Sequence, residues 1–304
     1  MELLYALENI RFPALTELML LITQLGEETF FLLIALTVFW CVNKREGYCL
    51  LTVGFLGTIL NQFLKLTCRI PRPWVQDPTF QAVEEAIPEA TGYSFPSGHT
   101  QSAVGTFGSI ACWAKRNWVR VVCIVLLLLV SFSRMYLGVH TPLDVGVSFG
   151  IAVVLSIGMY LAFRQPNLKI SYLLLGMFAI ASAFVLFVEL YSFPADIDPH
   201  NLESGIKNAY TLFGAAGGIC VAEWVDRKKT NFTNDACWWA QILKLLGGVA
   251  LVLGVKILLK SPLNALFAGH QFATAVRYFL MVIVAGVFWP MTFGWFSRLG
   301  KKNG

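Results

Sequence analysis

The stretch VGVSFGIAVVLSIGMYLAF at residues 145–163 contains no charged side chain, and neither does ISYLLLGMFAIASAFVLFV at residues 170–188. A helix that crosses a bilayer needs about 20 mostly apolar residues, and both stretches meet that length. The whole chain shares this character, because 57% of its 304 residues are hydrophobic and only 13% are charged. Soluble domains carry roughly 25% charged residues, and intrinsic disorder requires low hydrophobicity. The composition therefore predicts an all-α polytopic membrane protein.

Similar apolar runs recur on both sides of these two stretches. They predict a helical bundle with about nine transmembrane spans. The first span carries Glu27 and Glu28, and the eighth is interrupted by Lys244 and Lys256. The predicted spans are residues 22–42, 47–66, 98–114, 119–137, 143–163, 170–190, 206–223, 238–259 and 274–297.

Lysine and arginine residues gather in alternate loops between the predicted spans. Loops rich in these residues stay in the cytoplasm, so the set predicts a cytoplasmic carboxyl terminus and, with nine spans, an outer amino terminus. All four histidines fall in the opposite loops or at outer helix ends, which indicates a functional surface on the outer face. The cytoplasmic set consists of Lys44, Arg45, Lys115, Arg116, Arg120, Arg164, Lys169, Arg227, Lys228, Lys229, Arg298, Lys301 and Lys302.

Three short motifs at the ends of neighbouring spans place cations, imidazoles and a carboxylate on that outer face. Arginine forks and lysine ammonium groups bind phosphate oxygens. Ser97 and Gly98 begin a helix, where free backbone N–H groups favour an anion. We therefore expect a cradle for a tetrahedral oxyanion. The motifs are Lys65-x6-Arg72-Pro73, Pro96-Ser97-Gly98-His99 and Ser133-Arg134-x5-His140-x3-Asp144.

The spacing of His140 and Asp144 indicates a nucleophile. The two residues are four apart, so on a helix that begins near Thr141-Pro142 they lie on one face. A carboxylate at one ring nitrogen fixes the tautomer and raises the basicity of the other nitrogen. We expect His140 to accept a phosphoryl group, and His99 to protonate the leaving alkoxide and then activate water.

These motifs resemble, without a departure, the three signatures of the type 2 phosphatidic acid phosphatase superfamily. The resemblance covers roughly residues 15–163 and implies a phosphohistidine intermediate, with no metal or other cofactor. It makes His140 the nucleophile, Asp144 its partner and His99 the acid. The phosphate ligands that it implies are Lys65, Arg72, Ser97, Gly98, His99 and Arg134.

The resemblance divides the chain into a membrane phosphatase core at residues 1–163 and additional transmembrane helices of unknown role at residues 164–304. The family core has about six spans, and residues 164–304 show no family signature in the sequence itself. The loop at residues 74–95 is long and acidic and joins the first two motifs, so it is a candidate lid.

Two other groups of polar residues are explained without a metal site or a substrate-binding site. Asp196, Asp198, His200 and Glu203 are metal-ligand types, but their spacing matches no known loop pattern and favours a solvated outer loop. Lysine, histidine and arginine residues in the last third of the chain are interpreted as interfacial anchors, with a headgroup entrance as the alternative. They are Lys256, Lys260, His270 and Arg277.

We predict a membrane phosphatase that acts on a lipid phosphate monoester or pyrophosphate and binds no nucleic acid. The candidate lipids are undecaprenyl pyrophosphate, phosphatidylglycerophosphate, phosphatidic acid and sphingosine-1-phosphate. Two alternatives stay open: a phosphatase of a soluble ester, as in glucose-6-phosphatase, and an anion or lipid transporter with a degenerate phosphatase core. The intact histidine pair and Asp144 favour catalysis, because an anion binder needs no paired nucleophile.

The short loops favour a bacterial plasma membrane, with the active site on the outer face. One feature points elsewhere. Lys301-Lys302-Asn303-Gly304 has the form of a dilysine retrieval signal of the endoplasmic reticulum, on the cytoplasmic end where such a signal works.

Overall fold

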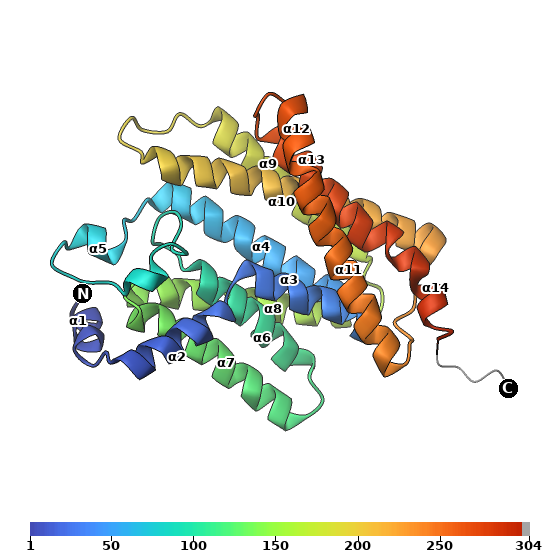
Figure 1. Ribbon diagram of the computed structural model, residues 1–304, viewed down its shortest axis with the longest axis horizontal. Coiled ribbons are helices and arrows are strands. Elements are labelled where there is room, and N and C mark those ends of the chain that lie inside the picture. The colour runs from blue at the N-terminus through green and yellow to red at the C-terminus, as the bar shows by residue number, and fades with distance from the viewer. Residues whose placement is uncertain (300–304) are drawn as a thin grey trace. The chain divides into compact units, whose positions relative to one another are not determined.

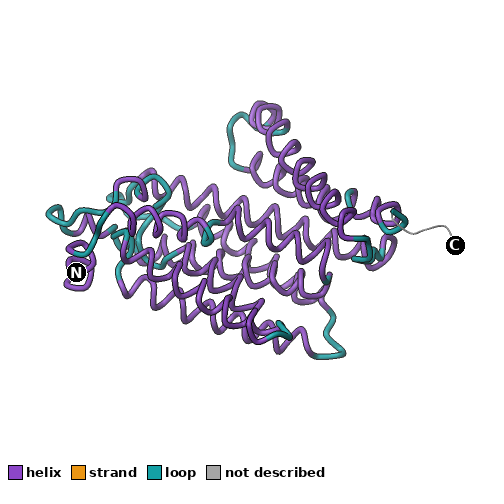
Figure 2. Tube along the Cα trace, turned by 60° about the horizontal axis from the view of Figure 1, so that its bottom comes forward, coloured by secondary structure: helices purple, strands orange, loops and turns teal. Residues whose placement is uncertain are grey.

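The computed structural model describes residues 1–299, and every regular element in that range is a helix (Figures 1 and 2). The predicted all-α membrane fold is confirmed. Lys301 and Lys302, which the sequence assigns to the cytoplasmic set and to the retrieval signal, lie outside the described residues.

The helices follow one another with short connections, apart from the long loop before α6 (Figure 1). Short π-helical and 3₁₀ segments, labelled η, extend or link several of them. The elements are α1 (Glu2–Asn9), α2 (Pro13–Gln24), α3 (Glu28–Thr37), η1 (Val38–Val42), α4 (Lys44–Cys68), α5 (Pro73–Gln76), η2 (Glu84–Ala86), α6 (Gly98–Trp113), α7 (Asn117–Tyr136), α8 (Pro142–Arg164), α9 (Ile170–Leu190), α10 (Pro199–Val225), η3 (Asp226–Thr230), α11 (Trp238–Leu258), α12 (Lys260–Leu266), α13 (Phe272–Ile283), η4 (Val284–Phe288), η5 (Pro290–Thr292) and α14 (Phe293–Phe296).

The predicted count of nine spans is not confirmed. In the described part of the chain, 6 helices are long and apolar enough to cross a membrane, or up to 7 if the bent pair of α2 with α3–η1 is one span. Each predicted segment contains a helix, but α6 and α10 fall outside that set. Helix α6 has 16 residues and buries polar side chains such as Thr100 and Gln101. It packs mainly against α7 and α8, so it needs no lipid-facing apolar surface.

The chain forms two compact units. Unit 1 consists of Met1–Leu32, Val53–Gln165 and Ser192–Gly205, and it holds all three sequence motifs. Unit 2 consists of Leu33–Thr52, Pro166–Tyr191 and Ile206–Gly304. The functional division into residues 1–163 and 164–304 stays a prediction.

Small residues and buried polar groups shape unit 2. A Cβ atom at Gly214 of α10 would collide with the backbone of Ala275 in α13, so glycine permits the close helix approach that is common in membranes. Lys244, which interrupts the eighth predicted span, is fully buried. Its Nζ lies 4.5 Å from the centroid of the Phe293 ring and donates to the Asn234 carbonyl at 3.4 Å. The ammonium group is therefore held inside the protein and not against lipid.

Candidate active site

The predicted site residues all lie in unit 1, at helix ends or in the connections next to them. Most are buried: Ser97 and Arg134 are fully inaccessible, and His140 and Asp144 are nearly so. Gly98 and His99 are half-buried. The residues come from the end of α4 (Lys65), the residue before α5 (Arg72), the start of α6 (Ser97, Gly98, His99), the end of α7 (Arg134), the turn after it (His140) and the first turn of α8 (Asp144).

The first turn of α8 fixes Asp144 beside His140. Pro142 is pre-organised for the first helical position, and Thr141 caps the helix. Thr141 Oγ1 accepts the Asp144 N–H at 3.3 Å, and Asp144 Oδ2 accepts the Thr141 N–H at 2.7 Å. This reciprocal capping box holds the carboxylate in one place. The expected proximity of His140 and Asp144 is present, with 3.6 Å between His140 Nδ1 and Asp144 Oδ2.

The two nitrogens of the His140 ring have different surroundings. Arg72 Nη1 lies 3.0 Å from His140 Nε2, and a guanidinium can only donate, so Nε2 carries the lone pair. The ring proton then sits on Nδ1, which faces Asp144. Burial, and after it the positive charges of Arg72, Arg134 and Lys65, holds the pKa of His140 well below its usual value. The imidazole is therefore neutral, with its lone pair on Nε2.

Two of the cations are anchored by backbone carbonyls of the 74–95 loop. Arg72 donates from Nη2 to Thr91 at 2.8 Å and from Nε to Gly92 at 3.1 Å. Lys65 Nζ donates to the Tyr93 carbonyl. The loop thus determines where these two charges lie, although its role as a lid stays a prediction.

Arg134 has hydrogen-bond donors that contact no acceptor in the described chain. Its Nη1 donates to Thr23 Oγ1 at 2.6 Å. Its Nε and Nη2 are buried and have no hydrogen-bond partner among the described residues. An unsatisfied buried donor costs about 1–3 kcal/mol, so these two nitrogens favour the binding of a hydrogen-bond acceptor. A bound oxyanion would satisfy both.

The sequence did not single out several residues that position the site. Ser94 Oγ donates to Asp144 Oδ2 at 2.6 Å, and Asn61 Nδ2 donates to the Pro96 carbonyl at 3.3 Å. Asn61 lies one turn before Lys65 on α4, a spacing that places both on one face of the helix. Thr23, in the first predicted span, anchors Arg134. Contacts between residues so far apart in sequence leave no local signal.

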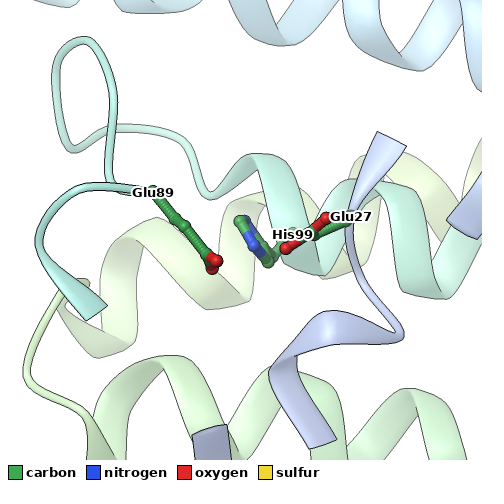
Figure 3. Close-up of side chains that lie close together, drawn as sticks. All are labelled: Glu27, Glu89 and His99. Atoms are coloured by element: carbon green, nitrogen blue, oxygen red, sulfur yellow. The ribbon is translucent and has the colours of Figure 1, made fainter. Parts of the chain in front are cut away.

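A cavity of about 890 Å³ opens beside Arg72 within unit 1. Its lining includes Arg69, Trp74 and Tyr93, together with Asp198 and His200 from the group first considered for a metal. Asp198 Oδ1 accepts the Asn201 N–H at 2.9 Å, as a residue near the start of α10 does. A different group of residues that can bind a metal ion lies close together in the described chain. It consists of Glu27, Glu89 and His99, with one carboxylate oxygen of each glutamate and one ring nitrogen of His99 within 4.8 Å of one another (Figure 3).

Comparison with known proteins supports the motif assignment. A model described as PAP2 superfamily matches residues 46–168. The undecaprenyl-diphosphatase BcrC of Bacillus subtilis (strain 168) is 31% identical over 157 residues, which cover 51% of this chain and 76% of that protein. The chain belongs to the PAP2 superfamily. The resemblance seen in the three motifs is confirmed, and this PAP2 protein is a membrane phosphatase by family.

Further matches cover the last third of the PAP2 protein and add two more relatives. A model described as PAP2 superfamily phosphatase, transmembrane extension, matches residues 210–302, where the sequence had shown no signature. Phosphatidylglycerophosphatase B of Bacillus subtilis (strain 168) is 30% identical over 161 residues, 48% of this chain and 74% of that protein. The undecaprenyl-diphosphatase of Sulfolobus acidocaldarius is 29% identical over 146 residues, 47% of this chain and 68% of that protein. No solved structure matches the chain.

Proposed function

We propose that this PAP2 protein hydrolyses a phosphate monoester or pyrophosphate of a lipid through a phosphohistidine formed on His140. The proposal rests on the tautomer of that imidazole. Its Nε2 lone pair faces Arg72, a phosphate ligand, and its Nδ1 proton faces Asp144. The relatives support a lipid substrate, since their names give undecaprenyl diphosphate and phosphatidylglycerophosphate.

The first chemical step forms the phosphohistidine. A bound phosphate group draws the Arg72 fork from His140 Nε2 to its own oxygens, which frees the lone pair. Nε2 attacks phosphorus, the bond from phosphorus to the leaving oxygen breaks, and protonated His99 gives its proton to that oxygen. Asp144 stabilises the positive charge that develops on the imidazole. Lys65, Arg72 and Arg134 stabilise the charge on the equatorial oxygens.

The second step returns the enzyme to its starting state. Water attacks phosphorus, neutral His99 accepts a proton from that water, and the phosphorus–nitrogen bond breaks. Phosphate leaves, and His140 is neutral again with its proton on Nδ1. Each proton given up in the first step is recovered in the second, so the cycle consumes only substrate and water. A transporter does not need a histidine with its lone pair on Nε2 and a carboxylate at Nδ1. This arrangement therefore favours catalysis over the transport alternative.

The function is tested by phosphate release from a panel of substrates. Purified protein in detergent is given undecaprenyl pyrophosphate, phosphatidylglycerophosphate, phosphatidic acid, sphingosine-1-phosphate and glucose-6-phosphate. We expect release from at least one lipid and none from the sugar phosphate. The assay contains EDTA, since three cations supply the charge that a metal provides in other phosphatases. Hydrolysis of glucose-6-phosphate alone, or activity that EDTA removes and magnesium restores, would contradict the proposal.

We further propose that the active site lies on the outer face of a bacterial plasma membrane and that the carboxyl terminus is cytoplasmic. The distribution of basic loops supports this orientation. The bacterial relatives support the choice of membrane.

Labelling of single cysteines in intact cells tests this orientation. Glu85→Cys in the 74–95 loop and Lys228→Cys in η3 both introduce a thiol at an exposed position. The five native cysteines that are not buried are first replaced by serine: Cys41, Cys68, Cys112, Cys220 and Cys237. We expect an impermeant maleimide to label Glu85→Cys in intact cells and Lys228→Cys only after permeabilisation. The reverse pattern would place the active site in the cytoplasm.

A further inference from the structure

The break between α2 and α3 lies against the backbone of His99. The chain bends by 50° at this break. A Cβ atom at Gly26 would come within 2.9 Å of the His99 carbonyl oxygen and within 2.8 Å of Val130 Cγ1. Only glycine allows so close an approach. The segment at residues 23–27, here called the elbow, is therefore a wall of the active site.

The elbow and the 74–95 loop bring two carboxylates to His99. Glu27 belongs to the elbow itself. Glu89 belongs to the loop and is held there by Gln24, whose Nε2 donates to its carboxylate oxygens at 3.1 Å and 3.4 Å. One oxygen of each carboxylate and one His99 ring nitrogen all lie within 4.8 Å of one another. Figure 3 shows the imidazole ring between the two side chains.

Burial and the positive charges of this part of the site oppose protonation of His99. Burial of the ring disfavours an imidazolium, and three cations and a second imidazole add to this effect. Asp144 is already engaged by Ser94 and Thr141 and faces His140. Glu27 and Glu89 are the carboxylates beside the ring. The groups that face His99 are Lys65, Arg72, Arg134, His140, Glu27 and Glu89.

We propose that Glu27 and Glu89 are positioning residues that keep His99 protonated, so that it can donate to the leaving oxygen. This inference rests on the proposed function, in which His99 is the general acid. The carboxylates exchange no proton with substrate or water in the cycle. The proton moves only from His99 to the leaving oxygen and later from water to His99. His99 Nε2 is buried and has no partner in the described chain, so it is free to face substrate.

The proposal predicts a dependence on the leaving group. An alkoxide leaves poorly and needs a proton, whereas p-nitrophenolate leaves well without one. A general acid contributes roughly 10²- to 10⁴-fold. We expect the double variant Glu27→Gln/Glu89→Gln to lose about 10²-fold in kcat on an alkyl lipid phosphate and far less on p-nitrophenyl phosphate. The alkaline limb of its pH–rate profile should move to lower pH, because the imidazolium loses its counter-charges and deprotonates earlier.

Three controls make the experiment specific. Glu85→Gln removes an exposed carboxylate from the same loop and should leave both rates unchanged. Thermal unfolding of each variant in detergent confirms that it is folded. In a His99→Ala background the two glutamine substitutions should cost nothing further, because residues that act as one unit are not additive.

Several outcomes would overturn the inference. Equal losses on both substrates with an unchanged pH profile would mean a merely structural role. Full activity of the double variant would mean no role. Bound metal in the purified wild type that the double variant lacks would make the group a metal site. Failure of the wild type to form a phosphohistidine would instead remove the proposed function, so the two failures are distinguishable.

Discussion

Replacement of His140 by alanine should abolish hydrolysis of every substrate, including p-nitrophenyl phosphate. The phosphoryl group has no acceptor without Nε2, and a better leaving group cannot compensate for the missing nucleophile. The loss should therefore be independent of the leaving group, in contrast to the loss expected when the acid is removed. The measurement is the rate of phosphate release by His140→Ala against wild type on an alkyl and an aryl ester.

The intermediate itself can be trapped. Wild-type protein that is given substrate with a labelled phosphate and quenched in alkaline denaturant should carry the label on His140. Treatment with acid should then release it, as a phosphoramidate requires. His99→Ala should still accept label from p-nitrophenyl phosphate, because only its proton donor is missing. Label on Ser97, or wild-type rates in His140→Ala, would refute the histidine nucleophile.

The motif residues lie at or next to helix ends because their positions follow local rules. Thr141-Pro142 and Ser97-Gly98 begin helices, and the four-residue spacing then sets Asp144 beside His140. Apolar runs between these motifs specify the helices that separate them. Residues 65, 72, 97–99, 134, 140 and 144 could therefore be assigned to the ends of neighbouring helices without a structure.

The supporting residues could not be found in this way. Thr23 and Arg134 are 111 residues apart, and Gln24 and Glu89 are 65 apart. The apolar pattern at residues 22–42 predicts a span in which Glu27 is an interruption. In the structure, the chain bends beside Gly26 and Glu27 approaches His99. The bend and the approach of Glu27 to His99 depend on tertiary packing, so the periodicity of apolar residues in the sequence does not indicate them.

The predicted count of nine spans is not confirmed for a related reason. Helix α6 is short and carries serine, threonine and glutamine side chains that are buried against other helices. Hydropathy identifies helices that face lipid, and it says little about one enclosed by protein.

Arg134→Gln should lower kcat/KM by about 10²- to 10³-fold, the usual result of removing one preorganised donor to a developing negative charge. Its Nε and Nη2 are buried donors without a partner in the described chain, so a phosphoryl group can engage them at no cost to existing bonds. The loss should be similar for alkyl and aryl esters, because these donors bind the equatorial oxygens and not the leaving group. Inhibition by inorganic phosphate should weaken in parallel.

Matched substitutions distinguish the contribution of the planar guanidinium donors of Arg134 from that of its positive charge. Arg134→Lys keeps the charge but loses the planar pair of donors, so it should recover little activity. Thr23→Val removes only the 2.6 Å anchor of Nη1, so we expect a smaller loss than for Arg134→Gln. Arg120→Gln, on the same helix but exposed, should behave as wild type. Recovery of most activity by Arg134→Lys would mean that the site needs a positive charge there and not two directed hydrogen bonds.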